Sequence, residues 1–319
     1  MTKLQKSHMF SKYGYTILLL CILFGWIVVM SVLSPKFLTY TNLSTVLIRM
    51  SEECIVAVGL TMVVLLGGID LSVGAVMALV PVIVASLYNL GVPFPIAMVI
   101  AFAAGLSVGL FNAFLVQKTR IQPMIATLAT MTIIRSVVYA ITSGTPINTF
   151  PPVFFTLAKN QLFGINYPIY IMILFIVGGT FLLKRTSFGR FVYAVGGNES
   201  AAKASGINVA NVRLVIYMIS ALCASFGGIL LASRLNVANS DAGMRTALDM
   251  LTAVLLGGTS IMGGEGSIPR TVIGVLIMSL VINGFNLLNI SSYWQLIVMG
   301  TLLVVIVGID AKRREGGMK

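Results

Sequence analysis

The sequence predicts an all-α polytopic membrane protein with one transmembrane domain over residues 1–319. Three observations predict it: 58% of the residues are apolar, only 9% are charged, and the mean hydropathy is +1.00. A soluble domain carries about a quarter charged residues, so this chain lacks the polar groups to cover a globule in water. Its 31 glycines are also typical of closely packed transmembrane helices.

The spans can be placed because a membrane-crossing helix needs roughly 20 apolar residues. Ten segments approach that length: 15–33, 43–69, 71–90, 94–116, 123–142, 167–183, 212–233, 247–262, 271–288 and 293–309. The second contains three charged residues near its start, and the eighth has only about thirteen uninterrupted apolar or small residues. These two are the candidates for a broken or interfacial helix. We expect about ten spans, with nine or eleven as the alternatives.

The distribution of lysine and arginine predicts the topology, because these residues are retained in the cytoplasm. If the N-terminus is inside, fifteen cations fall in cytoplasmic segments and four in external ones. This predicts that both termini are cytoplasmic. It also accounts for the net charge of +12 without a nucleic-acid partner. No small-residue cleavage site follows the first apolar segment, so we interpret that segment as a retained span.

Several kinds of chemistry have no matching residues in the sequence. His8 is the only histidine, and no phosphate-binding G-x-x-x-x-G-K-[ST] loop is present. We therefore expect no catalytic activity, no metal site and no cofactor bound by this chain. The acidic residues near or inside the predicted spans are Asp70, Asp249, Glu52 and Glu53. So few acidic groups give little support for proton- or sodium-coupled transport. Any energy source is expected on another chain.

The basic loop 184–213 contains a predicted short helix at about residues 198–206. Asn198 is a good N-cap, Glu199 and Lys203 stand four residues apart, and Gly206 can end the helix. Such a short helix is marginal in water, so it must pack against something. The alternatives are a cytoplasmic partner and this chain's own helix ends. The candidate residues are Gly196, Gly197, Asn198, Glu199, Ala202, Ser205 and Gly206.

A glycine-rich stretch at residues 67–74 separates the second and third predicted spans. Asp70 within it either lines a pathway or caps the helix expected to begin at Leu71. The preceding string at 64–68, Val-Leu-Leu-Gly-Gly, recurs at 254–258. Such a recurrence is consistent with two related halves, as transporters often have.

Taken together, several strings resemble the permease subunits of bacterial ATP-driven sugar importers of the ribose type. These strings lie at 34–43, 57–61, 68–74, 196–198, 205–208, 256–260 and 291–293. The resemblance covers nearly the whole chain. One departure follows Ser267, where Ile268, Pro269 and Arg270 replace the small residue and glycine more usual in the family.

The resemblance implies a multi-pass protein of the bacterial inner membrane. Two permease chains, identical or paralogous, would form the pathway. A separate cytoplasmic ATPase with two nucleotide-binding modules would bind ATP and Mg²⁺, and a periplasmic binding protein would deliver the sugar. It also implies that residues 196–208 meet the ATPase. We expect the external loop at 143–166 to contact the binding protein.

A pathway for a neutral sugar needs hydroxyl and amide groups rather than buried charge. Besides Asp70, the candidates are Asn112, Tyr217, Ser220, Asn283 and Asn286, each of which has interhelical hydrogen bonding as its simpler explanation. Arg135 in the fifth span needs a partner. We expect an ion pair with Asp249 or with one of the second-span glutamates, Glu52 and Glu53.

Three alternatives to a sugar importer remain open on the sequence. An ion-coupled secondary sugar carrier would share the hydropathy pattern. A membrane scaffold without transport would keep the short helix in the 184–213 loop. Within the importer class, the solute could instead be an amino acid or a nucleoside.

Overall fold

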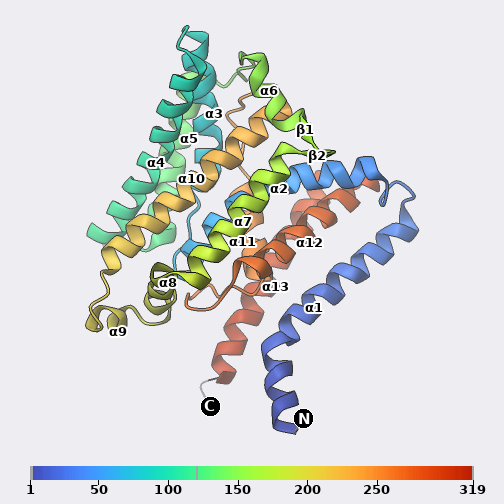
Figure 1. Cartoon of the computed structure of the whole chain (residues 1–319), viewed down its shortest axis with the longest axis vertical. Coiled ribbons are helices and arrows are strands. Elements are labelled where there is room, and N and C mark those ends of the chain that lie inside the picture. Colours follow the sequence, from blue (N-terminus) through green and yellow to red (C-terminus); the bar gives the residue numbers. More distant parts are fainter. Residues whose placement is uncertain (1–2, 120, 318–319) are drawn as a thin grey trace.

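The computed structural model describes residues 3–119 and 121–317, and the side chains of residues 14–119 and 121–308. In that part of the chain, thirteen helices and one two-stranded hairpin make up the regular structure (Figure 1). The all-α fold class is confirmed. His8 and the basic residues near the two termini lie outside the described side chains.

Each of the ten predicted segments corresponds to a helix. These helices are α1 (Lys3–Leu33), α2 (Tyr40–Leu65), α3 (Val73–Asn89), α4 (Phe94–Lys118), α5 (Pro123–Thr142), α7 (Tyr167–Arg185), α10 (Val209–Leu235), α11 (Thr246–Leu256), α12 (Ile268–Leu287) and α13 (Ser292–Gly317). Six described helices are long and apolar enough to cross a membrane: α1 from Gly14, α4, α5, α7, α10 and α12. The count of ten spans stays a prediction.

The remaining elements belong to the two long loops. The loop at 143–166 contains α6 (Pro152–Lys159) and a hairpin of β1 (Gln161–Leu162) and β2 (Ile165–Asn166). The loop at 184–213 contains α8 (Ser187–Gly197) and α9 (Glu199–Ala204). Figure 1 shows both chain termini toward the end of the molecule that carries α8 and α9, and α6 toward the opposite end.

Helix α11 corrects the eighth predicted span, 247–262. It has 11 residues, which makes it about 16 Å long, roughly half the hydrocarbon thickness of a bilayer. It ends at Leu256 with Gly257 as its C-cap, and Gly258 has a left-handed φ of +78° that turns the chain away from the helix. The apolar run continues past this point, but the helix does not.

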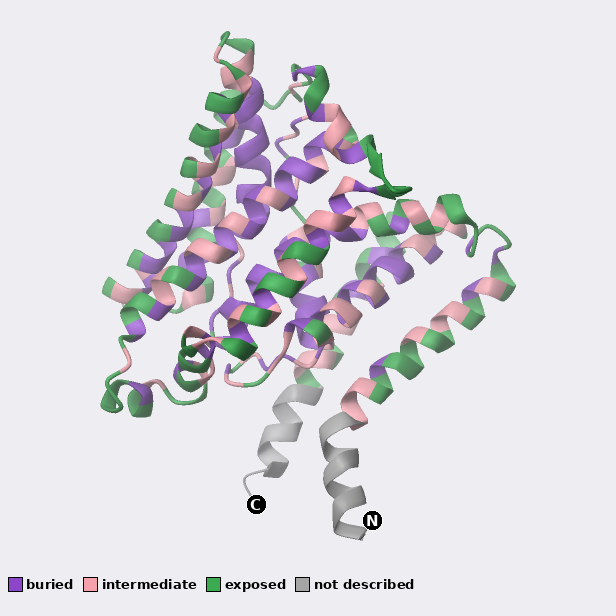
Figure 2. Ribbon diagram, in the orientation of Figure 1, coloured by how far each residue is buried: buried purple, intermediate pink, exposed green. Residues whose placement is uncertain are grey.

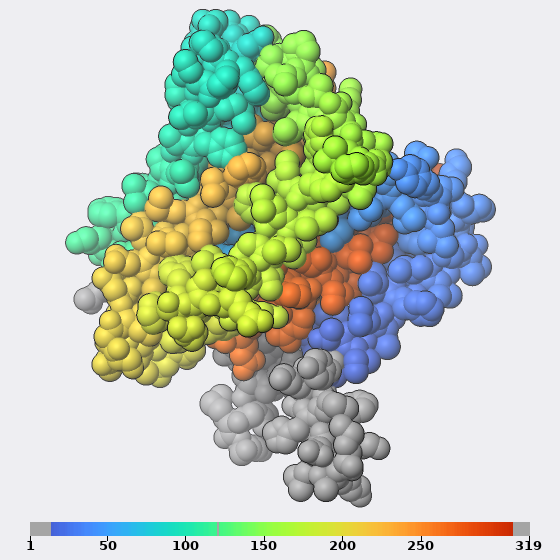
Figure 3. All heavy atoms as spheres, viewed as in Figure 1, coloured from blue at the N-terminus to red at the C-terminus, as the bar shows by residue number. Residues whose placement is uncertain are grey.

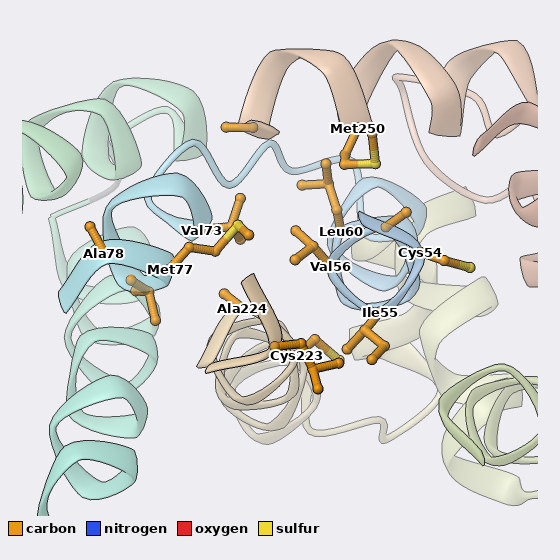
Figure 4. Packing of buried hydrophobic residues seen from close by; sticks show 14 of the residues in the cluster. Cys54, Ile55, Val56, Leu60, Val73, Met77, Ala78, Cys223, Ala224 and Met250 are labelled. Atoms are coloured by element: carbon orange, nitrogen blue, oxygen red, sulfur yellow. The ribbon is translucent and has the colours of Figure 1, made fainter. Parts of the chain in front are cut away.

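The centre of the molecule is the contact between α2 and α10. Helix α2 is buried on every side from Met50 to Leu65. Figure 4 shows Ile55 of α2 beside Cys223 of α10, and Val56 and Leu60 of α2 on the side toward Met77 of α3. The buried residues follow these central helices, and the exposed ones follow the outer helices (Figure 2).

Large apolar side chains cover the outside of the bundle. Phe24 of α1, Val99 of α4 and Leu174 of α7 are about two-thirds exposed. Helix α7 crosses the face shown in Figure 3, beside α10. Apolar side chains on the outside of spanning helices are the surface that lipid contacts.

Candidate functional site

Helices α8 and α9 occupy the predicted short-helix region and form what we call the α8–α9 pair (residues 187–204). The Asn198 side chain accepts a hydrogen bond from the Ala201 amide (2.9 Å), so the N-cap prediction is confirmed. Gly206 has a φ of +80°, and its amide donates to the Lys203 carbonyl (3.0 Å) just beyond the last turn. The predicted helix end is therefore also confirmed.

Helix α8 was missed at the sequence level. It begins where the Thr186 hydroxyl accepts from the Gly189 amide (3.1 Å). Its side chains Val192 and Val195 are buried in a hydrophobic cluster, and Phe188 of the same helix packs against that cluster. The spacing of these apolar residues is that of one helix face, which is the signal that could have found the helix.

Glu199 connects α9 to the start of α10. Its carboxylate accepts from Lys203 Nζ (2.6 Å), as predicted, and from an Arg213 guanidinium nitrogen (2.8 Å), which the sequence did not indicate. These hydrogen bonds, first that from Lys203 and then that from Arg213, lower the pKa of the Glu199 carboxyl. Ala202 lies buried beneath the helix, whereas Ser205 is exposed.

The end of α8 packs against two other backbone segments, a contact that we call the glycine junction (Gly196, Leu65, Gly263 and Gly264). A Cβ atom on Gly196 would lie 1.8 Å from the Leu65 carbonyl oxygen and 2.7 Å from the Gly264 nitrogen. The Gly264 amide donates to the same Leu65 oxygen (2.9 Å). Gly197, one residue on, has nothing within 4 Å of its Cβ position. Only glycine fits at residue 196.

Three of the predicted pathway residues, Asp70, Asn112 and Ser220, form a buried polar cluster together with Ser72. One Asp70 oxygen accepts from the Ser72 hydroxyl (2.6 Å) and amide (3.0 Å), and the other accepts from the Ser220 hydroxyl (2.8 Å). Asn112 of α4 donates to the Ser72 hydroxyl (2.7 Å). All four residues are at most 1% exposed. The cluster joins the α2–α3 connection to α4 and α10.

Asp70 therefore does more than cap a helix. Helix α3 begins at Val73 rather than at Leu71, and Ser72 at its N-cap makes no side-chain capping bond. Asp70 does accept from an amide at this helix start, but it also reaches across to α10. Capping is therefore only part of what this carboxylate does, and its role in a pathway stays a prediction.

Tyr217 lies one turn before Ser220 on α10 and faces a cavity of about 200 Å³. Its hydroxyl is buried and makes no hydrogen bond to another described residue. Gly68, Glu199 and Arg213 also line the cavity. The cavity therefore extends from the α2–α3 connection to the α8–α9 pair.

The other two pathway candidates lie apart from this cluster. Asn283 of α12 exchanges two hydrogen bonds with Asn42 of α2 (2.8 and 3.1 Å). The Asn286 side-chain oxygen accepts from Gln295 of α13 (3.0 Å). Both asparagines thus make the interhelical hydrogen bonds that were their simpler explanation.

The predicted ion pair of Arg135 is wrong. Its guanidinium donates to backbone carbonyls instead, at Ser240, Ala242 (2.8 Å) and Gly74 (3.0 Å). The physical reason is that an arginine has five donors in a fixed fork, and carbonyls in an irregular loop lack helical partners. The loop after α10 supplies two such carbonyls, and the third acceptor, Gly74, lies in the first turn of α3.

The acidic residues proposed for that pair have other arginines nearby. Glu53 pairs with Arg49 on its own helix (2.9 Å), and Glu52 pairs with Arg234 of α10 (2.5 Å). Asp249 lies in the first turn of α11. Within the described side chains, no group of three or more His, Cys, Asp or Glu residues is arranged to hold a metal ion.

Comparison with known proteins places this architecture in a family. The family described as "Branched-chain amino acid transport system / permease component" matches residues 42–307. The chain is 39% identical to the ribose import permease protein of Escherichia coli strain K12 over 292 residues, 90% of this chain and 91% of that protein. No solved structure gives a significant match.

Two further relatives show a similar extent of likeness. The chain is 41% identical over 293 residues to the ribose import permease protein of Bacillus subtilis strain 168, covering 91% of each chain. It is 36% identical over 301 residues to the D-allose transport system permease protein of E. coli strain K12, covering 94% of this chain and 91% of that one. The chain therefore belongs to this family of membrane permeases, in which it is similar to the ribose-type members.

Proposed function

We propose that this chain is the membrane-spanning permease subunit of an ATP-driven importer that carries a neutral sugar across the bacterial inner membrane. The observation that carries the proposal is the similarity, over nine-tenths of the chain, to permeases of ribose, allose and arabinose systems. A ribose-like pentose or a hexose is the solute class. The chain itself performs no covalent chemistry.

The partner that supplies the energy is a cytoplasmic ATPase, which holds ATP and Mg²⁺ on its own two nucleotide-binding modules. We place its contact on the outer face of the α8–α9 pair. Two features support this choice: Phe191 is 40% exposed on α8 although it is a large aromatic residue, and α9 presents Ala201 and Ser205 outward. Exposed aromatic side chains are frequent anchors of protein interfaces.

Two contacts connect the α8–α9 pair to the membrane-spanning helices and could transmit a displacement of the pair to them. One is the Glu199–Arg213 ion pair, which leads to α10. The other is the glycine junction, which leads to the end of α2. The buried polar cluster lies on α10 and on the connection that follows α2. We assign these contacts the role of transmitting the nucleotide state of the ATPase to the pathway.

Two further partners complete the proposed assembly. A second permease chain, identical or paralogous, contributes the other half of the pathway. A periplasmic binding protein delivers the sugar to the 143–166 loop, whose α6 and hairpin lie at the opposite end of the molecule from the α8–α9 pair (Figure 1).

The test of the ATPase contact is copurification of the mildly solubilised chain with its ATPase. Phe191→Glu puts a charge on the proposed docking face, and Ile121→Glu is the control, because Ile121 is equally exposed (41%) in the α4–α5 connection. Loss of the ATPase with Phe191→Glu alone supports the proposal. Equal copurification with both variants would place the contact elsewhere, and no copurification with the native chain would count against the importer.

The solute is tested separately by uptake in cells that carry the complete system. Ribose competes with the transported solute if the sugar assignment is right. Because the family description names branched-chain amino acids, leucine is the matched competitor, and a nucleoside is the third. Competition by leucine but not by ribose would overturn the sugar assignment while leaving the importer class intact.

A further inference from the structure

The segment between α10 and α11 enters the membrane-embedded part of the molecule. At its start, the Ser240 hydroxyl bonds to the hydroxyl of Thr142, the last residue of α5 (2.7 Å). Arg135, seven residues before the end of α5, donates to the carbonyls of both Ser240 and Ala242. The next residue, Gly243, packs against the start of α3, because a Cβ atom on it would overlap the Gly74 carbonyl oxygen, to which Arg135 also donates (3.0 Å). The segment before α11 therefore lies against α3 and α5 at the level of Arg135, inside the span of α5.

A second set of contacts places the neighbouring part of α2 at a similar depth. Glu53 accepts from the Ser279 hydroxyl of α12 (2.9 Å), and it pairs with Arg49 (2.9 Å). Ser279 is eight residues from Leu287, the end of α12, which corresponds to about 12 Å of helix. Arg49 and Glu53 thus lie well inside the span of α12.

Charged residues at this depth face the outside of the single chain. Arg49 is 36% exposed at its side chain, Arg245 is exposed, and Asp249 is half-buried one turn into α11. Charged side chains are costly to place in hydrocarbon, and in membrane proteins they almost always face the bundle interior or a water-filled cavity. This face is therefore unsuited to hydrocarbon, in contrast to the face of α7, where Leu174 is 69% exposed.

Helix α5 extends the same surface with hydroxyl groups. Thr132, Ser136 and Tyr139 are exposed on α5 at spacings of four and three residues, which places them on one side of the helix. The Tyr139 hydroxyl donates to Asp241, so this stripe is joined to the segment before α11. We call the whole surface the polar wall: Thr132, Ser136, Tyr139, Arg245, Asp249 and Arg49.

We propose that the polar wall lines a water-filled passage for a neutral polyol, between this chain and the second permease chain. The inference rests on the proposed function and deepens it. Hydroxyls, guanidinium N–H groups and carboxylate oxygens together donate to and accept from sugar hydroxyls, so the solute gives up few hydrogen bonds when it leaves bulk water. The buried polar cluster, whose residues are at most 1% exposed, is a closed part of the scaffold beside this passage.

The experiment measures the reactivity of single cysteines in the assembled importer in membrane vesicles. The background is Cys21→Ser, because Cys21 is exposed whereas Cys54 and Cys223 are buried. Leu248→Cys reports on α11 beside Asp249, and Leu174→Cys is its control on α7. The native leucines are 52% and 69% exposed. The probe is 2-sulfonatoethyl methanethiosulfonate, an anionic thiol reagent that stays in water.

The polar wall predicts that Leu248→Cys reacts at least about ten-fold faster than Leu174→Cys, because the reactive thiolate forms in water and not in hydrocarbon. Met244→Cys, at a residue 68% exposed in the native chain, repeats the test if Leu248→Cys fails to assemble. Equal rates at the wall and on α7 would overturn the inference. So would an unreactive Leu248→Cys that oxidises to a disulfide between two copies, because the wall would then be a subunit contact.

Failure of this inference can be distinguished from failure of the proposed function. Thiol labelling requires no transport and no known solute, whereas failure of the importer assignment appears as absence of the ATPase from the purified complex. A complex that contains the ATPase but shows no labelling at α11 contradicts only the polar wall.

Discussion

The buried polar cluster and the α8–α9 pair are both connected to α2 and α10, but they are held by different kinds of contact. The cluster is closed: Asp70, Ser72, Asn112 and Ser220 bond to one another and are excluded from solvent. The α8–α9 pair is open: it presents Phe191 and several polar and small residues outward, and it is held by the Glu199–Arg213 ion pair, the glycine junction and buried side chains such as Val192. The difference separates a fixed internal link from a surface that we propose contacts a partner.

Gly196→Val is expected to have the largest effect, because it breaks the connection between the two regions. Its side chain would overlap the Leu65 carbonyl, so α8 must move away from α2. Overpacking of this kind costs about 1–3 kcal/mol in stability, and we expect ATP-driven uptake to be lost. Gly197→Ala is the control, since its Cβ position is empty. Uptake that survived Gly196→Val would show that the glycine junction transmits nothing.

Asp70→Ala comes next and tests the closed region. It leaves the hydroxyls of Ser72 and Ser220 without their acceptor, and each unsatisfied buried group costs about 1–3 kcal/mol. The measurement is thermal unfolding of the purified chain in detergent. Asp70→Asn keeps one acceptor oxygen and should lose less stability than Asp70→Ala. If neither variant lowered the melting temperature, the cluster would not hold the α2–α3 connection.

Glu199→Gln has a smaller effect and tests the open region. The pKa of Glu199 is lowered by its hydrogen bonds with Lys203 and Arg213, so its contribution is present above the ordinary pKa of about 4.3 and is lost as the pH falls through the lower, folded-state value. Hydrogen exchange of the α9 amides should therefore quicken at acid pH in the native chain. Glu199→Gln should remove that pH dependence. If the exchange of the α9 amides in the native chain did not depend on pH after correction for intrinsic rates, the pairing of Glu199 would be contradicted.

Asn283→Ala is expected to have the smallest effect, because it lies outside both regions. It removes the two hydrogen bonds to Asn42, and interhelical bonds of this type average about 0.6 kcal/mol in one well-studied membrane protein. Unfolding should shift slightly and uptake should remain. A loss of uptake without a loss of stability would instead indicate that Asn283 lines the pathway.

The features that could be predicted from the sequence are local ones. Asn198 and Gly206 bound a helix through bonds to residues three positions away, so their types and spacing were sufficient. The same is true of the ten apolar segments, each of which corresponds to a helix.

The features that could not be predicted depend on distant parts of the chain. The carbonyls that accept from Arg135 lie 61 to 107 residues away along the sequence and belong to no motif. Helix α11 ends inside an apolar run because Gly258 turns the chain. The short apolar run of 247–262 indicated a broken or interfacial helix, but it did not indicate the residue at which the helix ends. The ion pair between Glu199 and Arg213 forms only because α9 folds back on α10.

The most direct measurement of the central claim is solute uptake by vesicles that contain this chain with its ATPase and binding protein, with all ion gradients collapsed. The account predicts sugar uptake that requires ATP on the side of the membrane where the ATPase lies. This uptake should stop when the ATPase is omitted. Uptake by vesicles that contain this chain alone, which needs no ATP and begins when a proton or sodium gradient is restored, would contradict it and identify an ion-coupled carrier.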